Sequence, residues 1–247
     1  MRRMVSVLTA ALLALGISGC SLDSSQTDKP ADSANATDPV PTKCKNPLGR
    51  KQSLISAREL AFCEAEALGK LAGYVQTDTI NGTVVSVSRV NIDPLMVEIT
   101  SEPNSDNPGS QVILANGAAY LKQPDGSWVQ ARPDSKEADV AYQATLPKRF
   151  EALMNPNLRA AGTSPNLVYT LGEAAKIGGD TVFVLEAEID DGSESGRKML
   201  SRIYVRPDYL VLRSETESTI SGRSTVRVSE LTGIDEPQRI INPRFER

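Results

Sequence analysis

The amino-acid sequence predicts an α+β fold, in which antiparallel strands follow one another along the chain and helices are interposed between them. Three observations support this prediction. Residues 53–72 repeat apolar side chains every three or four positions, as an amphipathic helix does. Most later segments alternate apolar and polar residues and are separated by turn sequences, as antiparallel strands are. No motif recurs with a period of about 20–50 residues, which argues against a repeat architecture.

The chain begins with a segment typical of an export signal. Arg2 and Arg3 precede an uncharged apolar run, residues 5–17, which is too short to span the ~30 Å hydrocarbon core of a membrane. The following residues, ISGC ending at Cys20, resemble the bacterial lipobox, whose cysteine receives a diacylglycerol after cleavage. We therefore expect residues 1–19 to be a lipoprotein signal peptide and Cys20 to be lipidated. The alternative is an ordinary secretory signal with an incidental cysteine.

Residues 20–48 are expected to be a disordered tether. They are mostly Ser, Thr, Asp, Ala and Pro, and such a segment cannot bury enough apolar surface to offset the entropy of ordering it. A flexible chain of this length has a root-mean-square reach of roughly 25–30 Å. The rest of the chain, residues 49–247, is expected to be a single domain.

The composition excludes several classes of function. The chain has no histidine, the commonest general base and metal ligand, and it lacks a Gly-x-Ser-x-Gly elbow, a phosphate loop and metal-ligand spacing. With a net charge of −4 and no basic stripe, nucleic acid is not expected as a partner. Aromatic residues make up only 4%, so a stacking platform for sugars is poorly supported. We expect a protein without catalytic residues, metal or cofactor.

One acidic cluster lies in the second half of the chain. The cluster lacks the spacing of a calcium loop, so solvation of a strand end and turn is the preferred interpretation; its members are Glu186, Glu188, Asp190, Asp191 and Glu194.

Cys44 and Cys63 remain once Cys20 is lipidated, and in an oxidising compartment an even pair favours a disulfide. Such a bridge contributes ~3 kcal/mol in the chain-entropy model. The alternative is two unpaired thiols.

The first half of the domain is predicted as one helix, several strands and a second helix. Ser53 can cap the first helix, and Gly73 can end it. The expected strands are 83–90, 95–100, 111–115 and 118–122. Asn116-Gly117 between the last two is a strong hairpin signal, and a turn at 124–126 precedes Trp128. Pro147 is well placed to open a short helix that ends at Asn155-Pro156.

The second half is predicted as strands, which are 181–189, 198–205, 209–218, 224–231 and 238–241. Two of them mix aliphatic with small or hydroxyl residues on one face: Met199, Ser201, Ile203 and Val205, then Leu210, Leu212, Ser214 and Thr216. If this face is buried, the small side chains leave volume, and volume lined by aliphatic residues suits acyl chains. Otherwise these residues simply lie on the solvent side near the strand ends.

Several motifs, in a constant order over roughly residues 52–243, resemble the LppX/LprAFG family of actinobacterial lipoproteins. They are ANGAAYL at 115–121 with DGSW at 125–128, the stretch 142–156 ending in Asn-Pro, GGDTVFV at 178–184, the pair 203–205 and 210–212, and 226–228 with 240–243. The chain departs from the family in its shorter first strands and in the Cys44/Cys63 pair.

The resemblance implies an antiparallel β half-barrel similar to LolA and LolB, with helices packed on one side and enclosing a hydrophobic cavity for acyl chains. Candidate wall residues, each alternating on an apolar face, are Leu95, Val97, Ile99, Phe183, Leu185, Ala187, Ile203 and Leu212.

The resemblance further implies a non-enzymatic carrier of an envelope lipid or glycolipid. It would be lipid-anchored on the extracytoplasmic face of the cell membrane, and a membrane exporter is open as a partner. The alternative function is an envelope interaction or sensor lipoprotein whose core is filled.

Overall fold

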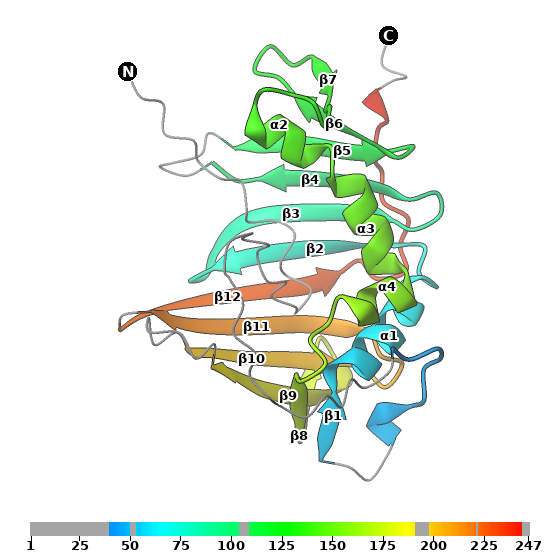
Figure 1. Ribbon diagram of the computed structural model, residues 1–247, viewed down its shortest axis with the longest axis vertical. Helices are drawn as coiled ribbons and strands as arrows, with labels where there is room; N and C mark the ends of the chain where they lie inside the picture. The colour runs from blue at the N-terminus through cyan, green and yellow to red at the C-terminus, as the bar shows by residue number, and fades with distance from the viewer. Residues whose placement is uncertain (1–39, 50–52, 104–108, 191–197, 221, 244–247) are drawn as a thin grey trace, which may run out of the picture.

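A computed structural model describes residues 40–49, 53–103, 109–190, 198–220 and 222–243. The expected signal peptide and Cys20 lie outside this part of the chain. Within it, twelve strands form one antiparallel sheet, and the helices lie against one face of that sheet (Figure 1). Strands β1 and β7 are its two edges, so the sheet is open. The expected architecture, an α+β half-barrel with helices on one side, is confirmed.

The strand order is β1-β8-β9-β10-β11-β12-β2-β3-β4-β5-β6-β7, so most neighbours in the sheet are also neighbours along the chain. The bounds of the strands are β1 Leu54–Ser56, β2 Gly73–Ile80, β3 Thr83–Asn91, β4 Met96–Ser101, β5 Ser110–Ala115, β6 Ala118–Lys122, β7 Trp128–Gln130, β8 Val168–Ile177, β9 Asp180–Asp190, β10 Lys198–Val205, β11 Val211–Ile220 and β12 Arg223–Thr232.

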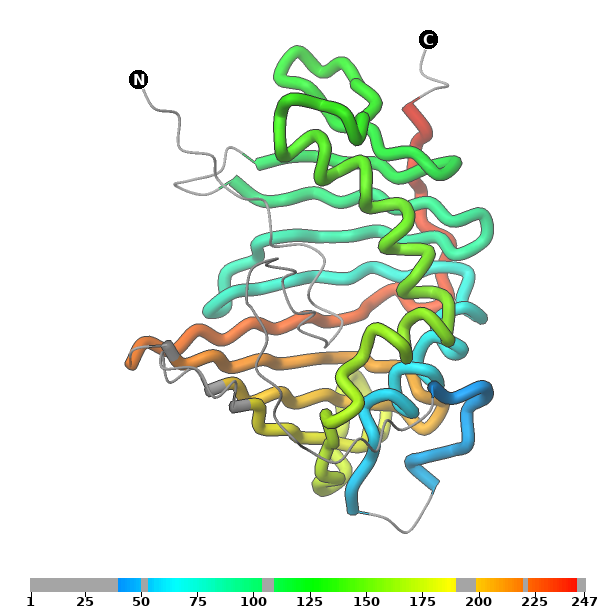
Figure 2. The backbone as a smooth tube through the Cα atoms, viewed as in Figure 1, coloured from blue at the N-terminus to red at the C-terminus, as the bar shows by residue number. Residues whose placement is uncertain are grey.

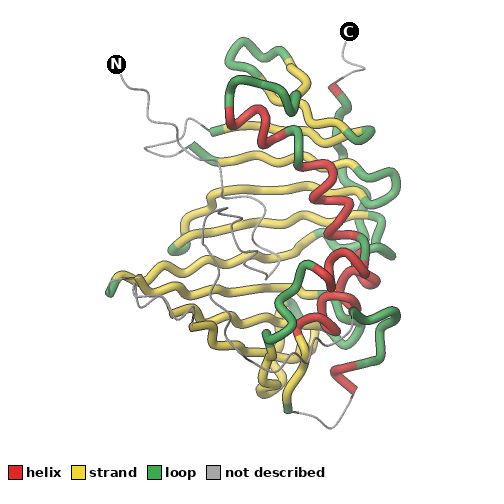
Figure 3. Tube along the Cα trace, in the orientation of Figure 1, coloured by secondary structure: helices red, strands yellow, loops and turns green. Residues whose placement is uncertain are grey.

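The helices form a second layer, which runs diagonally across the strands in Figure 3. Their bounds are α1 Ala57–Leu68, α2 Ala138–Gln143, α3 Leu146–Met154 and α4 Pro156–Ala161, with a short 3-10 turn at Pro47–Gly49. α1 packs against α4, and α3 contacts β5 and β6. Asn155 ends α3 and also caps α4, because its side-chain oxygen accepts hydrogen bonds from the backbone of Asn157 and Leu158.

The turns follow the local sequence closely. Asn116 and Gly117 have φ values of 52° and 70°, as a type I′ hairpin turn requires, and they join β5 to β6 as predicted. The turn at 124–126 contains Gly126 at φ 85°. Both positions favour residues that tolerate the left-handed region, which is why these turns could be recognised from the sequence alone.

The first helix is shorter than predicted. Residues 54–56 form strand β1 because they pair with β8, and flanking bonds run from Ala57 N to Leu167 O at 3.0 Å and from Leu171 N to Ser53 O at 2.8 Å. α1 therefore starts after Ser56 and ends before Gly69. Gly73 belongs to β2, where a Cβ would lie 2.5 Å from the Val90 carbonyl oxygen.

The strand expected at 238–241 is absent from the described structure of that segment, and this prediction is wrong. The Asn91 side chain donates to the Gln238 carbonyl at 2.8 Å and accepts from the Gln238 N–H at 2.7 Å. This side-chain amide therefore satisfies the backbone groups of Gln238 that a neighbouring strand would otherwise bind. Figure 2 shows this segment rising past the ends of β2 to β5. Ile240 packs there with Ile113 and Tyr120.

Candidate functional site

The face of the sheet that lies under the helices is the candidate site, and we call it the inner face. Val97 and Ile99 of β4 share one buried cluster with Leu146 and Phe150 of α3, which identifies the side of β4 that faces the helices. Cross-strand pairing then extends this assignment from strand to strand, because residues directly opposite each other in a ladder point to the same face.

By this register, the eight candidate wall residues lie on or at the border of the inner face. Ile203 lies opposite Leu185 in β9 and opposite Ser214 in β11, and Ala187 lies opposite Ser201. Leu212 falls at a register shift between β10 and β11, where the local pairing skips it. Leu95 directly precedes β4 and, like Phe183, is half-buried; the other six are buried.

The structure divides these eight residues between two packed clusters. Leu95, Val97, Ile99 and Leu212 belong to the cluster that includes α3. The other four belong to the cluster that includes Ala57 and Leu60 at the start of α1, and they are Phe183, Leu185, Ala187 and Ile203. The candidate residues thus share a face but not a single apolar cluster.

The hydroxyl residues of β10 and β11 lie inward. Ser201 and Ser214, two members of the mixed faces, are 5% and 9% exposed, so they do not lie on the solvent side. Ser214 is also the first member of a continuous polar row, in which each residue lies directly opposite the next across six neighbouring strands. The row consists of Ser214, Ser229, Asp78, Ser86, Ser101 and Ser110.

The polarity of the inner face is graded along the strands. Two residues before Asp78 along β2, the corresponding row is mixed: Leu231, Gln76, Ser88, Ile99, Val112 and Leu121. Two residues further back it is apolar throughout: Tyr74, Val90, Val97, Leu114 and Ala119. The inner face is therefore apolar at one end of these strands and polar toward the other. The sequences QTDT in β2 and SVS in β3 already contain the polar residues of the inner face, but β2 was not predicted as a strand from the sequence.

Asp78 is the electrostatic centre of the polar row. Its side chain is fully buried and accepts hydrogen bonds from Ser86 Oγ at 2.9 Å and from Gln76 Nε2 at 3.3 Å. Arg227 Nη2 lies 3.9 Å from Asp78 Oδ2. Burial raises the pKa of the Asp78 carboxyl, and Arg227 together with hydrogen bonds from Ser229, Ser86 and Gln76 opposes that rise.

A buried ion pair joins two of the helices that cover this face. Arg159 of α4 pairs with Glu64 of α1, and their side chains are 1% and 10% exposed. Burial raises the pKa of the Glu64 carboxyl, whereas the charge and hydrogen bond of Arg159 lower it. Burial likewise raises the pKa of nearby Tyr74 on the inner face.

The outer face of the sheet has the opposite character. Arg202 of β10 lies between Glu186 and Glu215 on its two neighbouring strands and pairs with both, and Arg213 pairs with Glu215. These side chains are partly exposed, as expected for a solvated face. Glu186, a member of the acidic cluster seen in the sequence, thus belongs to this charged ladder. Among the residues that the structure describes, no group of three metal-ligating side chains comes together.

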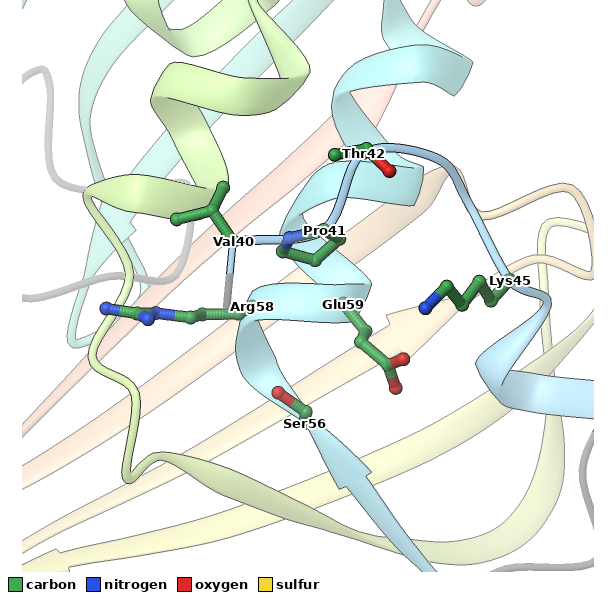
Figure 4. A pocket seen from close by; sticks show the side chains of 7 residues that line it. All are labelled: Val40, Pro41, Thr42, Lys45, Ser56, Arg58 and Glu59. Carbon is green, nitrogen blue, oxygen red and sulfur yellow. The ribbon is translucent and has the colours of Figure 1, made fainter. Parts of the chain in front are cut away.

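The disulfide and an open pocket lie outside the inner face. Cys44 and Cys63 are joined, with their Cα atoms 4.9 Å apart, so residues of the expected tether are fastened to α1. Leu48 is also buried, and the packed part of the chain therefore begins before residue 49. A pocket of about 450 Å³ is lined by Val40, Pro41, Thr42, Lys45, Ser56, Arg58 and Glu59. Figure 4 shows these side chains. Five of the pocket's seven lining residues are polar or charged, which does not suit acyl chains.

Comparisons with known proteins found similarity in structure only. Neither the family comparison nor the search of curated proteins gave a match. LprF from Mycobacterium bovis is 15% identical, covering 76% of this chain and 96% of its own, with a TM-score of 0.49. The lipoprotein LppX from Mycobacterium tuberculosis is 15% identical, covering 74% and 97%, with a TM-score of 0.44.

A LolA superfamily protein from Nitrosomonas europaea is 10% identical and covers 77% of this chain and 96% of its own, with a TM-score of 0.27. The names LprF and LppX are those of the family whose motifs the sequence resembles. In the described residues, no helix is long and apolar enough to cross a membrane.

Proposed function

We propose that this protein is a lipid carrier of the bacterial envelope, anchored to the membrane through Cys20 and binding the acyl chains of a lipid or glycolipid between the inner face and the helices. It would carry this lipid between the membrane and the cell envelope. Burial of acyl chains would drive binding, at ~0.8 kcal/mol per buried methylene.

The observation that carries the proposal is the composition of the inner face. Seven of the eight candidate wall residues come from strands β4, β9, β10 and β11, and Leu95 directly precedes β4. They lie on or at the border of the inner face and pack in clusters that include residues of α1 and α3. The inner face also carries small serines such as Ser201 and Ser214, whereas a sheet face that serves only to pack helices is normally filled by larger apolar side chains. An open sheet can also change its distance from the helices without breaking a closed ring of strands.

A second function is supported by a different observation. The candidate residues pack in two buried clusters, as they would in a filled core, which favours an envelope interaction or sensor protein. Native mass spectrometry of protein purified from the envelope separates the two functions. A carrier should retain lipid of defined mass, whereas a filled core should give the polypeptide mass with its N-terminal modification alone.

Ala187→Trp provides the matching perturbation. Ala187 is 5% exposed and lies opposite Ser201 on the inner face. If the clusters separate to admit acyl chains, the indole occupies that space, so the bound lipid is lost and the melting temperature changes little. If the core is filled, the indole overpacks it at ~1–3 kcal/mol, and the melting temperature falls. Val226→Trp is the control, because Val226 of β12 is 38% exposed and its position opposite Glu217 places it on the outer face.

Loss of lipid in Ala187→Trp but not in Val226→Trp supports the carrier. Wild-type protein without lipid, together with strongly lowered melting of Ala187→Trp, would refute it.

A further inference from the structure

The polar row is the feature of the inner face that binding of acyl chains does not explain. Five of its six residues are buried, and Asp78 at its centre is fully buried. Burying polar groups costs free energy unless each finds hydrogen bonds, and burying a carboxyl costs more. Acyl chains offer no hydrogen bonds, so this row serves neither helix packing nor acyl binding.

The groups around Asp78 form a mixed set of donors and acceptors with little net charge. One carboxyl and one guanidinium, that of Arg227, lie 3.9 Å apart. Around them are serine hydroxyls, which both donate and accept, and the amide of Gln76, whose bonds to the two Asp78 oxygens are long at 3.3 and 3.4 Å. Such a set can exchange its internal hydrogen bonds for bonds to a hydroxyl-bearing ligand.

A separate observation marks the end of the row. Ser110 Oγ is buried and has no hydrogen-bond partner among the described residues. Ser110 lies opposite Ser101, which lies opposite Ser86, and Ser86 binds Asp78. A buried hydroxyl without a partner is unfavourable unless a water or a ligand satisfies it. The row therefore contains both a charged centre and a hydrogen-bonding position left open.

We propose that the polar row, together with Gln76 and Arg227, binds the polar part of the carried lipid, and that this part is uncharged and hydroxylated, as in a glycerol or sugar headgroup. The proposal rests on the proposed function, because it assigns the polar end of the same ligand. The graded inner face would place acyl chains over the apolar row and the headgroup over Asp78. A phosphate headgroup is disfavoured, because it would bring a second anion to the Asp78 carboxyl in a site with one guanidinium.

The test offers the purified mature protein three lipids that share the same acyl chains. Vesicles of dioleoyl phosphatidylcholine contain equal amounts of dioleoylglycerol, monogalactosyl dioleoylglycerol and dioleoyl phosphatidylglycerol, and bound lipid is measured by native mass spectrometry. We expect the wild type to prefer the galactosyl lipid to phosphatidylglycerol by about tenfold, the effect of one net hydrogen bond. Asp78→Asn should reduce that preference to near unity while total bound lipid is retained.

Two further variants make the assignment specific. Asp180→Asn is the matched control, because the Asp180 side chain is 52% exposed beside Arg206, and it should bind as the wild type does. Ser86→Ala removes a hydroxyl that donates to Asp78. It replaces Asp78→Asn as the test of the headgroup preference if Asp78→Asn melts far below the wild type.

The outcomes separate the two proposals. A wild type that takes up none of the lipids, phosphatidylcholine included, overturns the proposed function and this inference with it. Uptake of phosphatidylcholine alone overturns this inference only. Uptake without preference, a preference for phosphatidylglycerol, or an unchanged preference in both Asp78→Asn and Ser86→Ala overturns this inference alone.

Discussion

Replacing Arg159 by methionine should strongly destabilise the helix layer over the inner face. Arg159 is almost fully buried, and its partner Glu64 is the charge left behind. Methionine has a similar length and fills the space, so the effect isolates the lost charge rather than a cavity. Arg159 also donates from Nη1 to the Leu153 carbonyl at 3.5 Å, a long bond whose loss adds little.

The magnitude follows from the burial of the pair. Removing one partner of a buried ion pair leaves an uncompensated charge and typically costs about 3–5 kcal/mol. For a domain of this size, 1 kcal/mol corresponds to about 2–4 °C in melting temperature, so a fall of about 6–20 °C is expected. The double variant Glu64→Met/Arg159→Met should recover most of the loss, because it leaves no buried charge.

The deficit should also depend on pH with a definite sign. Burial already raises the pKa of Glu64 above its ordinary 4.5, and loss of Arg159 removes the groups that lower it. A carboxyl whose pKa is higher in the folded than in the unfolded state stabilises the fold below the unfolded pKa, and that stability is lost as pH rises through the folded pKa. The deficit of Arg159→Met should therefore be small near pH 4 and larger at neutral pH.

Urea denaturation followed by circular dichroism at several pH values would measure these effects. Arg202→Met is the control: Arg202 pairs with Glu186 on the outer face, where both side chains are partly exposed, so its loss should cost only about 0–1 kcal/mol. Equal stability losses in Arg159→Met and Arg202→Met, or a double variant no more stable than Arg159→Met, would refute the reasoning.

Two other predictions concern the cysteines. Cys20→Ser should move the protein from the membrane fraction to the soluble fraction with an unlipidated or uncleaved mass; a variant that stays membrane-bound at the wild-type mass contradicts lipidation at this residue. Cys44→Ser/Cys63→Ser should lower the free energy of unfolding by ~3 kcal/mol, because the unfolded chain regains the freedom that the cross-link removes. Non-reducing peptide mapping provides the direct check, and two alkylatable thiols in protein from the envelope would argue against the disulfide.

The features that could be read from the sequence depend on neighbours along the chain. The Asn116-Gly117 turn was recognised because its backbone conformation favours those two residues. The helix ending at Asn155-Pro156 was recognised because the residue before proline avoids the helical region. The disulfide was expected because two cysteines remain besides Cys20 and an exported chain enters an oxidising compartment. Each of these signals lies within a few residues or in the composition.

Contacts between distant residues decided the remainder. Residues 54–56 continue a helical pattern in the sequence, yet they form a strand because β8, more than 100 residues later, satisfies their backbone groups. At the other end of the chain, the amide of Asn91 binds the backbone of Gln238, so no strand forms there.

The polar row was decided in the same way. Single serines on five strands say little by themselves, and β2, which contributes Asp78, went unrecognised. Only the register of six strands places these side chains in one line on the inner face. The sequence alone determined the turns and most strands. Tertiary pairing determined which side chains meet, because a shift of one residue in register moves every side chain to the opposite face.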